Sequence, residues 1–480
     1  MSRSYPESKL GPPAEIEDRS PGFWRALREA LAGTEQDYTS GSLLRAITLL
    51  AVPMVLEMLM QSVFGVVDVY FVSRIGPEAV AAVGMTDSLL VLVLAVAMGL
   101  GMATTAMVAR RIGEKDPAGA ARAAFQALAA GGAVSIPISL LGIFFAKDLL
   151  VLMGASEAVV AAGWSYCAIL FGTNAVIVFL FLMNAIFRGA GDAVLAMRAL
   201  WLANLLNIGL DPLLIFGIGP FPELGVAGAA VATSIGRAVG IGYQLYVLLG
   251  GRSRIRMGRA AVGVDLGVMR RLLRISGPGM LQYVVGTASW LALYRIMASF
   301  GSDAMAGYTI ALRILVFALL PSWGMGNAAA TLVGQNLGAG RVDRAERAVW
   351  ITSGINMAFL GATAVFVIFY AEALIGLFTG APEVLAYGVD CLRIVSYTYV
   401  FFAFGVVTMQ SFNGAGDTAT PTWINLVCYW LIQLPLAYAL AMEAGMGARG
   451  VFVAITVAQA VLALTATFLF RRGGWKLKVV

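Results

Sequence analysis

The chain has 480 residues, of which 60% are apolar and only 12% are charged, and its mean hydropathy is +0.84. A soluble protein of this length needs far more polar surface, so lipid must form part of its solvent. The net charge of +6 does not indicate a nucleic-acid partner, because the basic residues gather in separate loops.

The first 40 residues contain no apolar stretch able to act as a secretory signal. We therefore expect residues 1–41 to be a cytoplasmic tail. Within it Phe23, Trp24, Leu27 and Leu31 fall on one side of a short predicted helix, which could lie along the membrane surface.

Beyond this tail, apolar stretches long enough for a spanning helix, roughly 20 residues, recur with short breaks. The sequence therefore predicts an all-α protein with twelve transmembrane helices. The predicted spans are residues 47–73, 81–109, 119–146, 160–187, 196–217, 225–249, 272–298, 305–333, 345–370, 385–411, 420–441 and 449–470.

Basic residues are distributed unequally between the two sets of loops. One set and the C-terminal tail hold many, whereas the opposite set holds only Arg74, Lys147 and Arg449. This asymmetry follows the positive-inside rule and predicts a multi-pass protein of the inner (plasma) membrane with both termini in the cytoplasm. The residues on the basic side are Arg110, Arg111, Lys115, Arg122, Arg188, Arg198, Arg252, Arg254, Arg256, Arg259, Arg270, Arg271, Arg274, Arg341, Arg344, Arg347, Arg471, Arg472, Lys476 and Lys478.

An internal repeat with an offset of 225 residues divides the chain into two halves. The block Gly-Ala-Gly-Asp at 189–192 returns at 414–417, and four further pairs of identical residues have the same offset. Each half holds an even number of helices, which predicts two parallel six-helix lobes around a shared cavity. We assign 42–250 to the N-lobe, 251–271 to a cytoplasmic loop, and 272–480 to the C-lobe with a short basic tail. The matched pairs are Pro53 with Pro278, Gly76 with Gly301, Gly99 with Gly324, and Gly113 with Gly338.

The motifs of several other membrane protein classes are missing from the sequence. No acidic ring or carbonyl-filter motif of a channel repeats between the halves. The chain has no histidine for base or metal chemistry, its three cysteines lie far apart inside predicted spans, and it has no phosphate-binding loop. These features favour a secondary transporter without a cofactor over an enzyme.

Several motifs resemble the multidrug and toxic compound extrusion (MATE) family. They are Pro53 with the run 61–68, the segment 188–192, the run 207–212 followed by 225–233, and the repeated segment 413–418. The resemblance covers residues 42–470 and implies a V-shaped, two-lobed antiporter, expected to act as a monomer. It would expel small organic compounds, often cationic, in exchange for protons or sodium ions.

The resemblance also implies a set of coupling residues. The DinF-like branch keeps them in the first lobe, and they map onto Asp68, Asn207, Asp211, Thr233, Asn184 and Gln61. A NorM-like branch depends on an acidic residue in the first helix of the second lobe. The span 276–299 contains no Asp or Glu, so this chain is placed nearer the DinF-like branch.

The residues themselves point to the same carboxylates. A carboxylate inside the membrane is costly unless it is paired, hydrated or protonated, so each one is a functional candidate. Asp68 and Asp211 are predicted at similar depth near the outer ends of their helices, with Thr233 close to that level and Asn207 one turn below Asp211. Such a cluster could bind a proton or a sodium ion.

Two further residues of the first span are candidates. Glu57 lies about 16 Å below Asp68 on the same helical face and could relay cations inward; alternatively it is buried and neutral, or paired with a basic residue. Pro53 removes a helical hydrogen bond, which prepares this helix, like the one containing Pro278, to bend.

Comparison of the two halves shows that the carboxylates are not repeated. Asp68, Glu57 and Asp211 align with Leu293, Gln282 and Leu434. This indicates a coupling site confined to the N-lobe, although divergence after duplication would also explain it.

Three local features have structural interpretations, and two other functions stay open. The Gly-Ala-Gly-Asp blocks suit turns, with Asp capping the next helix, and Asp390 is placed to pair with Arg393.

A lipid-linked oligosaccharide flippase would need several cationic residues in its cavity, for which Arg237, Arg295, Arg313 and Arg393 are the candidates. A scaffold would bind a partner through the arginine-rich loop at 252–274.

Overall fold

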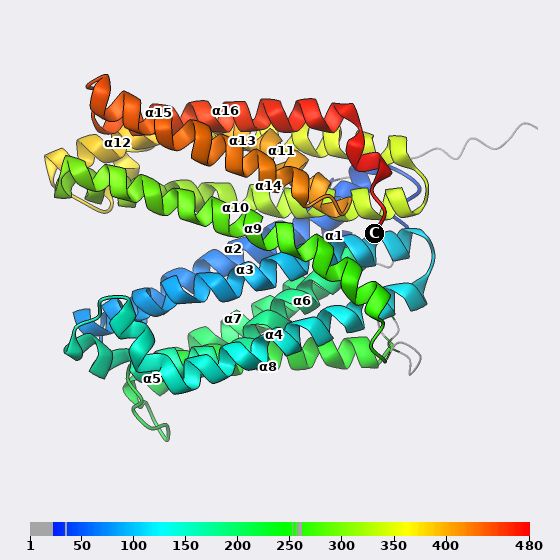
Figure 1. Cartoon of the computed structure of the whole chain (residues 1–480), viewed down its shortest axis with the longest axis horizontal. Coiled ribbons are helices and arrows are strands. Elements are labelled where there is room, and N and C mark those ends of the chain that lie inside the picture. The colour runs from blue at the N-terminus through cyan, green and yellow to red at the C-terminus, as the bar shows by residue number, and fades with distance from the viewer. Residues whose placement is uncertain (1–22, 34–35, 252, 256, 258–261) are drawn as a thin grey trace, which may run out of the picture.

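The computed structural model describes residues 23–33, 36–251, 253–255, 257 and 262–480, and these residues form helices and connecting loops without a strand. Figure 1 shows two helical bundles, one above the other, with the C-terminus at one end of the molecule. The predicted tail at 1–41 is thus described from residue 23 onward apart from 34–35, and it contains the short helix α1 (Phe23–Ala32). The remaining residues of that tail lie outside the described ranges.

The N-lobe consists of long helices that follow one another in antiparallel order. They are α2 (Leu43–Ser73), α3 (Pro77–Gly113), α4 (Pro117–Leu152), the pair α5 (Glu157–Gly172) and α6 (Asn174–Ala190), α7 (Ala193–Phe216) and α8 (Val226–Leu249).

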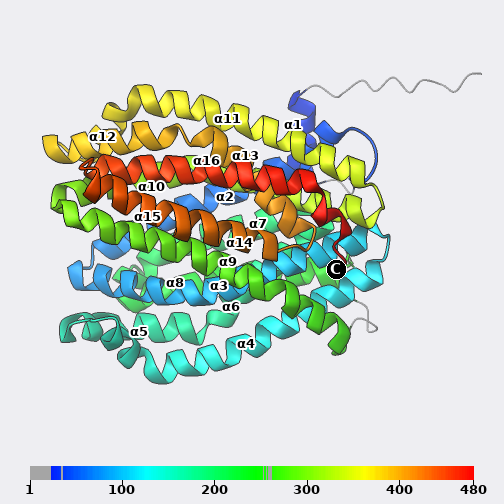
Figure 2. The ribbon, with the colours of Figure 1, turned by 45° about the horizontal axis from the view of Figure 1, so that its top comes forward.

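The C-lobe repeats this order. Its helices are α9 (Leu266–Met297), α10 (Ser302–Gly338), α11 (Val342–Gly376), the pair α12 (Pro382–Ser396) and α13 (Tyr399–Gly414), a span made of α14 (Ala419–Asn425), η3 (Leu426–Gln433), α15 (Leu434–Tyr438) and η4 (Ala439–Glu443), and α16 (Ala448–Arg472). The short 3-10 turns η2 (Ala298–Phe300) and η5 (Gly474–Leu477) follow α9 and α16. Figure 2 shows α11 and α12 at one edge of the molecule and α4 and α5 at the other.

Most of these helices are long and apolar enough to cross a membrane. Within the described ranges, nine helices pass a test of length and hydropathy, and two further spans are bent pairs. The long helix α9, which carries arginines at 270, 271, 274 and 295, is outside that count and completes the predicted twelve.

The fourth span of each lobe is broken, which the predicted continuous spans at 160–187 and 385–411 did not anticipate. Helices α5 and α6 meet at 46°, and α12 and α13 meet at 56°. At the first break, Asn174 donates to the carbonyl of Phe171 and Thr173 donates to the carbonyl of Ile169. Polar side chains thus donate hydrogen bonds to carbonyls at the break. This reduces the free-energy cost of bending the helix inside an apolar environment.

Two glycines that match in the sequence repeat lie at close contacts between the lobes. A Cβ on Gly99 of α3 would lie 2.6 Å from the Met280 backbone nitrogen of α9, and a Cβ on Gly324 of α10 would lie 2.7 Å from the Val55 nitrogen of α2. These contacts correspond at the offset of 225 residues. The first helix of each lobe therefore packs closely on the second helix of the other lobe, about a two-fold pseudo-symmetry axis.

Hydrogen bonds between the lobes gather at one end of the molecule, which we call the basic end; the opposite end is the far end. Gln335 donates to the carbonyl of Gly189 and Thr331 to that of Arg188. Arg110 of the N-lobe donates to the carbonyls of Ala415 and Lys478 in the C-lobe. The basic end carries the connections at 113–117, 190–193, 338–342 and 414–419 and the described end of the chain.

The hydrophobic cores agree with this arrangement. One large core lies mainly in the N-lobe and also includes Leu272 and Ile275 from the start of α9, and another lies within the C-lobe. The basic half of α2, by contrast, packs in a third core with Met325, Ala328 and Leu332 of α10. Pro53 lies inside α2, at the end of the segment that packs against the other lobe.

Candidate cation-coupling site

Three of the predicted coupling residues form one hydrogen-bonded group between α7 and α8. The Asn207 amide donates to Oδ1 of Asp211 and to Oγ1 of Thr233, at 3.1 Å each. All three side chains are buried, and Asp211 is 0% exposed. Asn207 and Asp211 face each other because they are one helical turn apart.

A glycine allows these two helices to approach closely. A Cβ on Gly236 would lie 2.5 Å from the carbonyl oxygen of Ala203 and 3.3 Å from the Cβ of Asn207. The contact brings α8 onto α7 at the level of the site. Thr233 can therefore reach an amide on the neighbouring helix.

Asp68 on α2 lies close enough to this group to interact electrostatically with Asp211, and it is partly buried. Three buried oxygens here have no hydrogen-bond partner: Oδ1 of Asp68, Oδ2 of Asp211 and Oδ1 of Asn207. We call Asp68, Asn207, Asp211 and Thr233 the coupling layer, and its donor set of carboxylate, amide and hydroxyl oxygens fits a small cation or a proton.

Asn184 and Glu57 belong to a second group nearer the basic end. Glu57 accepts hydrogen bonds from Arg188 at 2.8 Å and from Asn184 at 3.3 Å, and Asn184 accepts one from Gln244 at 2.6 Å. Glu57 is 1% exposed, and its Oε2 has no partner. Of the alternatives open for Glu57, the structure has the arrangement in which it pairs with a basic residue of another helix.

The six predicted coupling residues are thus divided between levels of the lobe. Asn184 joins Glu57 rather than the coupling layer. Gln61 lies on α2 between Glu57 and Asp68 and is partly buried. Pro53 lies a further turn toward the basic end on the same helix.

Two charged residues next to the coupling layer were not among the predicted site residues. Asp87 on α3 interacts electrostatically with Asp68 and with Arg237 on α8. Arg237 was considered only as a flippase candidate. Both are single ionisable residues in predicted spans, and that signal was available in the sequence.

Two predictions about local contacts were wrong. Asp390 pairs with Arg449 at 2.7 Å rather than with Arg393, because α16 brings Arg449 closer than the neighbour on its own helix. Asp192 does not cap α7; it accepts a hydrogen bond from the backbone of Arg254. Its partner in the repeat, Asp417, does act as predicted, because it accepts hydrogen bonds from the backbone N–H and the hydroxyl of Thr420 at the start of α14. It also pairs with Lys478.

Other local predictions are confirmed. Gly191 and Gly416 have φ angles of +87° and +85°, which glycine adopts easily. The three cysteines, Cys167, Cys391 and Cys428, are free and buried.

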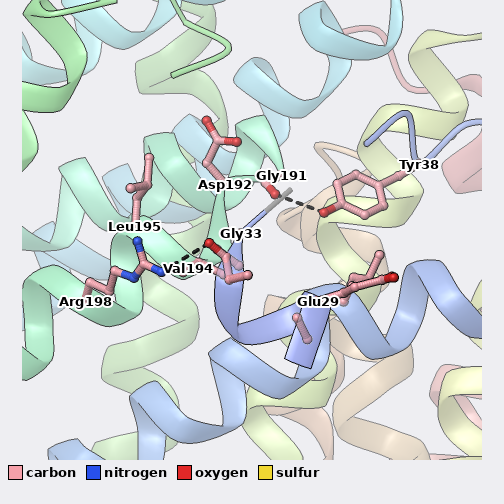
Figure 3. A pocket seen from close by; sticks show the side chains of 12 residues that line it. Glu29, Gly33, Tyr38, Gly191, Asp192, Val194, Leu195 and Arg198 are labelled. Carbon is pink, nitrogen blue, oxygen red and sulfur yellow. Dashed lines mark hydrogen bonds between the residues drawn. The ribbon is translucent and has the colours of Figure 1, made fainter. Parts of the chain in front are cut away.

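A small pocket lies at the basic end, away from the coupling layer. It has a volume of about 220 Å³, and none of the described residues that line it is a predicted coupling residue. Figure 3 shows Tyr38 directed at the carbonyl of Gly191 and Arg198 directed at the end of α1. These contacts attach the segment before α2 to the start of α7.

Comparisons with known proteins agree with this architecture. The MatE family model matches residues 53–213 and again 278–439, so its two matches begin at Pro53 and Pro278. The chain is 25% identical over 450 residues to the probable multidrug resistance protein YoeA of Bacillus subtilis, covering 93% of this chain and 97% of that protein. It is 26% identical over 443 residues to the probable multidrug resistance protein NorM of Thermotoga maritima, covering 90% and 93%.

A solved structure is also similar. The crystal structure of MATE in complex with MaL6 has a TM-score of 0.86 and 28% identity, and it covers 91% of this chain and 97% of that one. The two-lobed fold and the repeat predicted from the motifs are those of this group. The chain therefore belongs to the MatE family, the multidrug and toxic compound extrusion family, and is a multi-pass membrane transporter rather than an enzyme.

Proposed function

We propose that this chain exports small organic compounds in exchange for protons or sodium ions, and that the cation binds in the coupling layer of the N-lobe. The observation that supports this most is the Asn207 amide joining Asp211 to Thr233, with Asp68 facing them and three buried oxygens left unpartnered. The names of YoeA and NorM as multidrug resistance proteins support the class of substrate.

The chemistry of the layer favours a cation. Buried polar atoms without partners are costly, and carboxylates that face each other cannot both stay ionised cheaply. A proton would neutralise one of the carboxylates, and a sodium ion would be held by their oxygens together with those of Asn207 and Thr233. No cofactor takes part, and a monomer suffices because one chain supplies both lobes.

The side of the membrane on which the basic end lies sets the direction in which the described state is open. If the positive-inside rule places this end in the cytoplasm, the inter-lobe hydrogen bonds close the cytoplasmic side, and the described state faces outward. A cation from outside would then reach the coupling layer near the far end. The protein would lie in the plasma membrane with both termini in the cytoplasm.

Cation binding would change the conformation of the N-lobe by bending α2. Neutralising Asp68 removes its repulsion with Asp211, which allows the far half of α2 to move toward α7. The basic half of α2 is held in a core with α10, so the movement is a bend at Pro53. A cation that binds the bent form more tightly shifts the population toward it, and the organic compound leaves the narrowed cavity.

The contacts of the candidate arginines do not favour a flippase function. Arg237, the cationic residue on which it would depend in this lobe, interacts with the carboxylates of Asp68 and Asp87. Arg393 is directed at the carbonyl of Ile368. Part of the loop on which a scaffold function would depend, residues 252, 256 and 258–261, lies outside the described ranges.

The proposal is tested with purified protein in liposomes loaded with a fluorescent organic cation. Asp68→Asn and Asp211→Asn should each reduce export driven by a proton or sodium gradient at least about tenfold, while the protein stays monodisperse. Asp390→Asn, which changes a carboxylate at the far end of the C-lobe, is the matched control and should export normally. Wild-type export by both N-lobe variants would contradict the proposal.

The conformational step has its own test. Pro53→Ala should preserve binding of the organic cation and slow its export. In detergent, the affinity of the wild-type protein for the compound should fall as protons or sodium ions are added, and this response should weaken in the variant. An affinity that responds to neither cation would refute the coupling mechanism even if the site were correct.

A further inference from the structure

An arginine lies next to the coupling layer, on its basic-end side. Arg237 is one turn along α8 from Thr233, and its guanidinium carbon is 5.8 Å from the centroid of the Phe64 ring on α2. Phe64 in turn is one turn from Asp68. The cation of Arg237 therefore rests on an aromatic face between α8 and α2.

Arg237 and Asp87 lie at the same level of the lobe. Asp87 is ten residues from the start of α3 at Pro77, and Arg237 is eleven from the start of α8 at Val226, so both are about 15 Å from the far ends of their helices. By the same measure Asp68 and Thr233 are only about 8–10 Å from those ends. Arg237 and Asp87 thus form a second layer, about one turn deeper.

Ionisable groups of three other helices lie near this arginine. Asp68 on α2, Asp87 on α3 and Tyr166 on α5 interact with it electrostatically. Asp211 on α7 interacts with Asp68. The guanidinium thus lies near the carboxylates of two other helices, α2 and α3.

Deeper in the lobe, polar side chains continue toward the basic end. Gln61 and Glu57 lie on the same face of α2 as Asp68, and Glu57 continues to Asn184 and Gln244. A cation in the coupling layer would therefore find oxygen ligands along α2. At the level of Phe64 this track is interrupted, and there the guanidinium of Arg237 lies over the ring.

We propose that Arg237 is an electrostatic barrier on the basic-end side of the coupling site. A cation from the far end can reach Asp68 and Asp211, but the positive charge of Arg237 repels it from the polar side chains that continue toward Glu57. A fixed arginine in a narrow polar passage excludes other cations by charge repulsion. The proposal rests on the proposed function, because it assumes that the coupling layer takes up a cation.

Asp87 has a separate part in this arrangement. A guanidinium beside Asp68 alone would neutralise that carboxylate and compete with the coupling cation. Asp87 attracts the guanidinium from another helix at the deeper level and so keeps Asp68 available. Removing Asp87 should weaken cation uptake, whereas removing Arg237 should open a leak, so the two substitutions have different signatures.

The test measures passive cation flux in liposomes without any organic substrate. The full-length protein is reconstituted with an internal pH-sensitive or sodium-sensitive dye, and a potassium diffusion potential drives cations inward. Arg237→Gln and Arg237→Met should raise the flux at least about tenfold over wild type, and Arg237→Lys should restore a low flux. Asp87→Asn should show no leak but reduced export.

Two comparisons locate the leak. Arg313→Gln, which removes an exposed arginine from α10 of the C-lobe, should leave the flux unchanged. The double variant Asp68→Asn with Arg237→Gln should lose most of the leak, because the path then lacks its entry carboxylate. Methionine retains a stem able to pack on Phe64, so Arg237→Met serves if the glutamine variant fails to fold.

Three results would overturn the proposal: a wild-type flux in the monodisperse Arg237 variants, an equal leak in Arg313→Gln, or a leak that persists in the double variant. Each is distinguishable from failure of the proposed function. That failure would appear as normal substrate export by Asp68→Asn and Asp211→Asn, which is measured separately.

Discussion

Replacing Gly338 with alanine should shift the transporter away from the state in which the basic ends of the lobes are joined. A Cβ on Gly338 would lie 2.1 Å from the carbonyl oxygen of Arg110 in the other lobe. The repeat contains the reciprocal contact, in which a Cβ on Gly113 would lie 2.0 Å from the carbonyl of Gln335. Both neighbours are backbone atoms, so no side-chain rotation can relieve the clash, and the lobes must separate by more than 1 Å to reach ordinary contact distances.

Overpacking of this kind costs about 1–3 kcal/mol. Since each 1.4 kcal/mol is a factor of ten, the joined state should lose roughly five-fold to 150-fold in relative population. The contact exists only where the lobes meet at this end, so the cost falls on the described state and not on one with the basic ends apart.

Distances between spin labels measure this shift. Ile218 and Leu377 are exposed and stand near the far ends of the N-lobe and the C-lobe, so cysteines there report far-end separation in a background lacking the three native cysteines. Gly338→Ala should increase the population with shorter far-end distances. Gly277→Ala on α9, where a Cβ would meet nothing within 4 Å, is the matched control. Identical distance distributions in the two variants would refute the reasoning.

Two further predictions concern stability. Glu57→Ala should destabilise the protein by at most about 3–5 kcal/mol, since it leaves Arg188, whose side chain is 15% exposed, as a largely buried charge without its partner. A thermal melt of the purified protein would detect the loss, and a melting temperature equal to wild type would contradict it. Hydrogen bonds from Thr39 hold the pKa of Asp37 below its ordinary value of 3.8, so the stability that Asp37 contributes is present above that value and is lost as the pH falls further. The segment at 36–41, which Arg341 and Arg344 attach to the C-lobe, should therefore become more sensitive to proteolysis on acidification below about pH 4, and Thr39→Val should flatten that dependence.

Much of the fold was predictable because its signals are local or periodic. Apolar length indicates each span, and the repeated glycines mark positions where backbones approach or turn. Gly99 and Gly324 illustrate this, because a matched pair at one offset became a matched pair of close inter-lobe contacts. Asn207 and Asp211 were predictable together since one helical turn separates them.

The less predictable features depend on how helices turn relative to one another. The resemblance implied Asn184 as a coupling residue but did not give its level in the lobe. It lies on α6, which is bent by 46° relative to α5 at a break that no apolar periodicity marks, and it bonds Glu57. Asp87 and Arg237 are 150 positions apart in the sequence, on different helices, so only the packed lobe shows that they interact. Asp390 had a suitable neighbour three residues away and instead paired with an arginine of another helix.

The most informative comparison is between the coupling layer and the corresponding region of the C-lobe. At the repeat offset, Asp68 and Asp87 correspond to Leu293 and Leu312, and both leucines are buried in the C-lobe core. Aligning Gly225 with Gly447, the glycines before α8 and α16, makes Thr233 correspond to Ile455, which lies in the same core.

The two lobes therefore share their inter-lobe contacts but not their interiors. Side chains in a close-packed apolar core resist deformation, because any gap loses contact energy. A polar layer with unpartnered oxygens has no such constraint, and its energy changes when a cation arrives. If the lobes must change shape relative to each other during transport, this difference predicts that α2 and its neighbours in the N-lobe deform while the C-lobe moves as a rigid body. Filling the N-lobe layer with the C-lobe residues, as in Asp68→Leu combined with Asp87→Leu, should then stiffen the N-lobe. Hydrogen exchange in α2 would measure it, and unchanged exchange around Pro53 would contradict this division of roles.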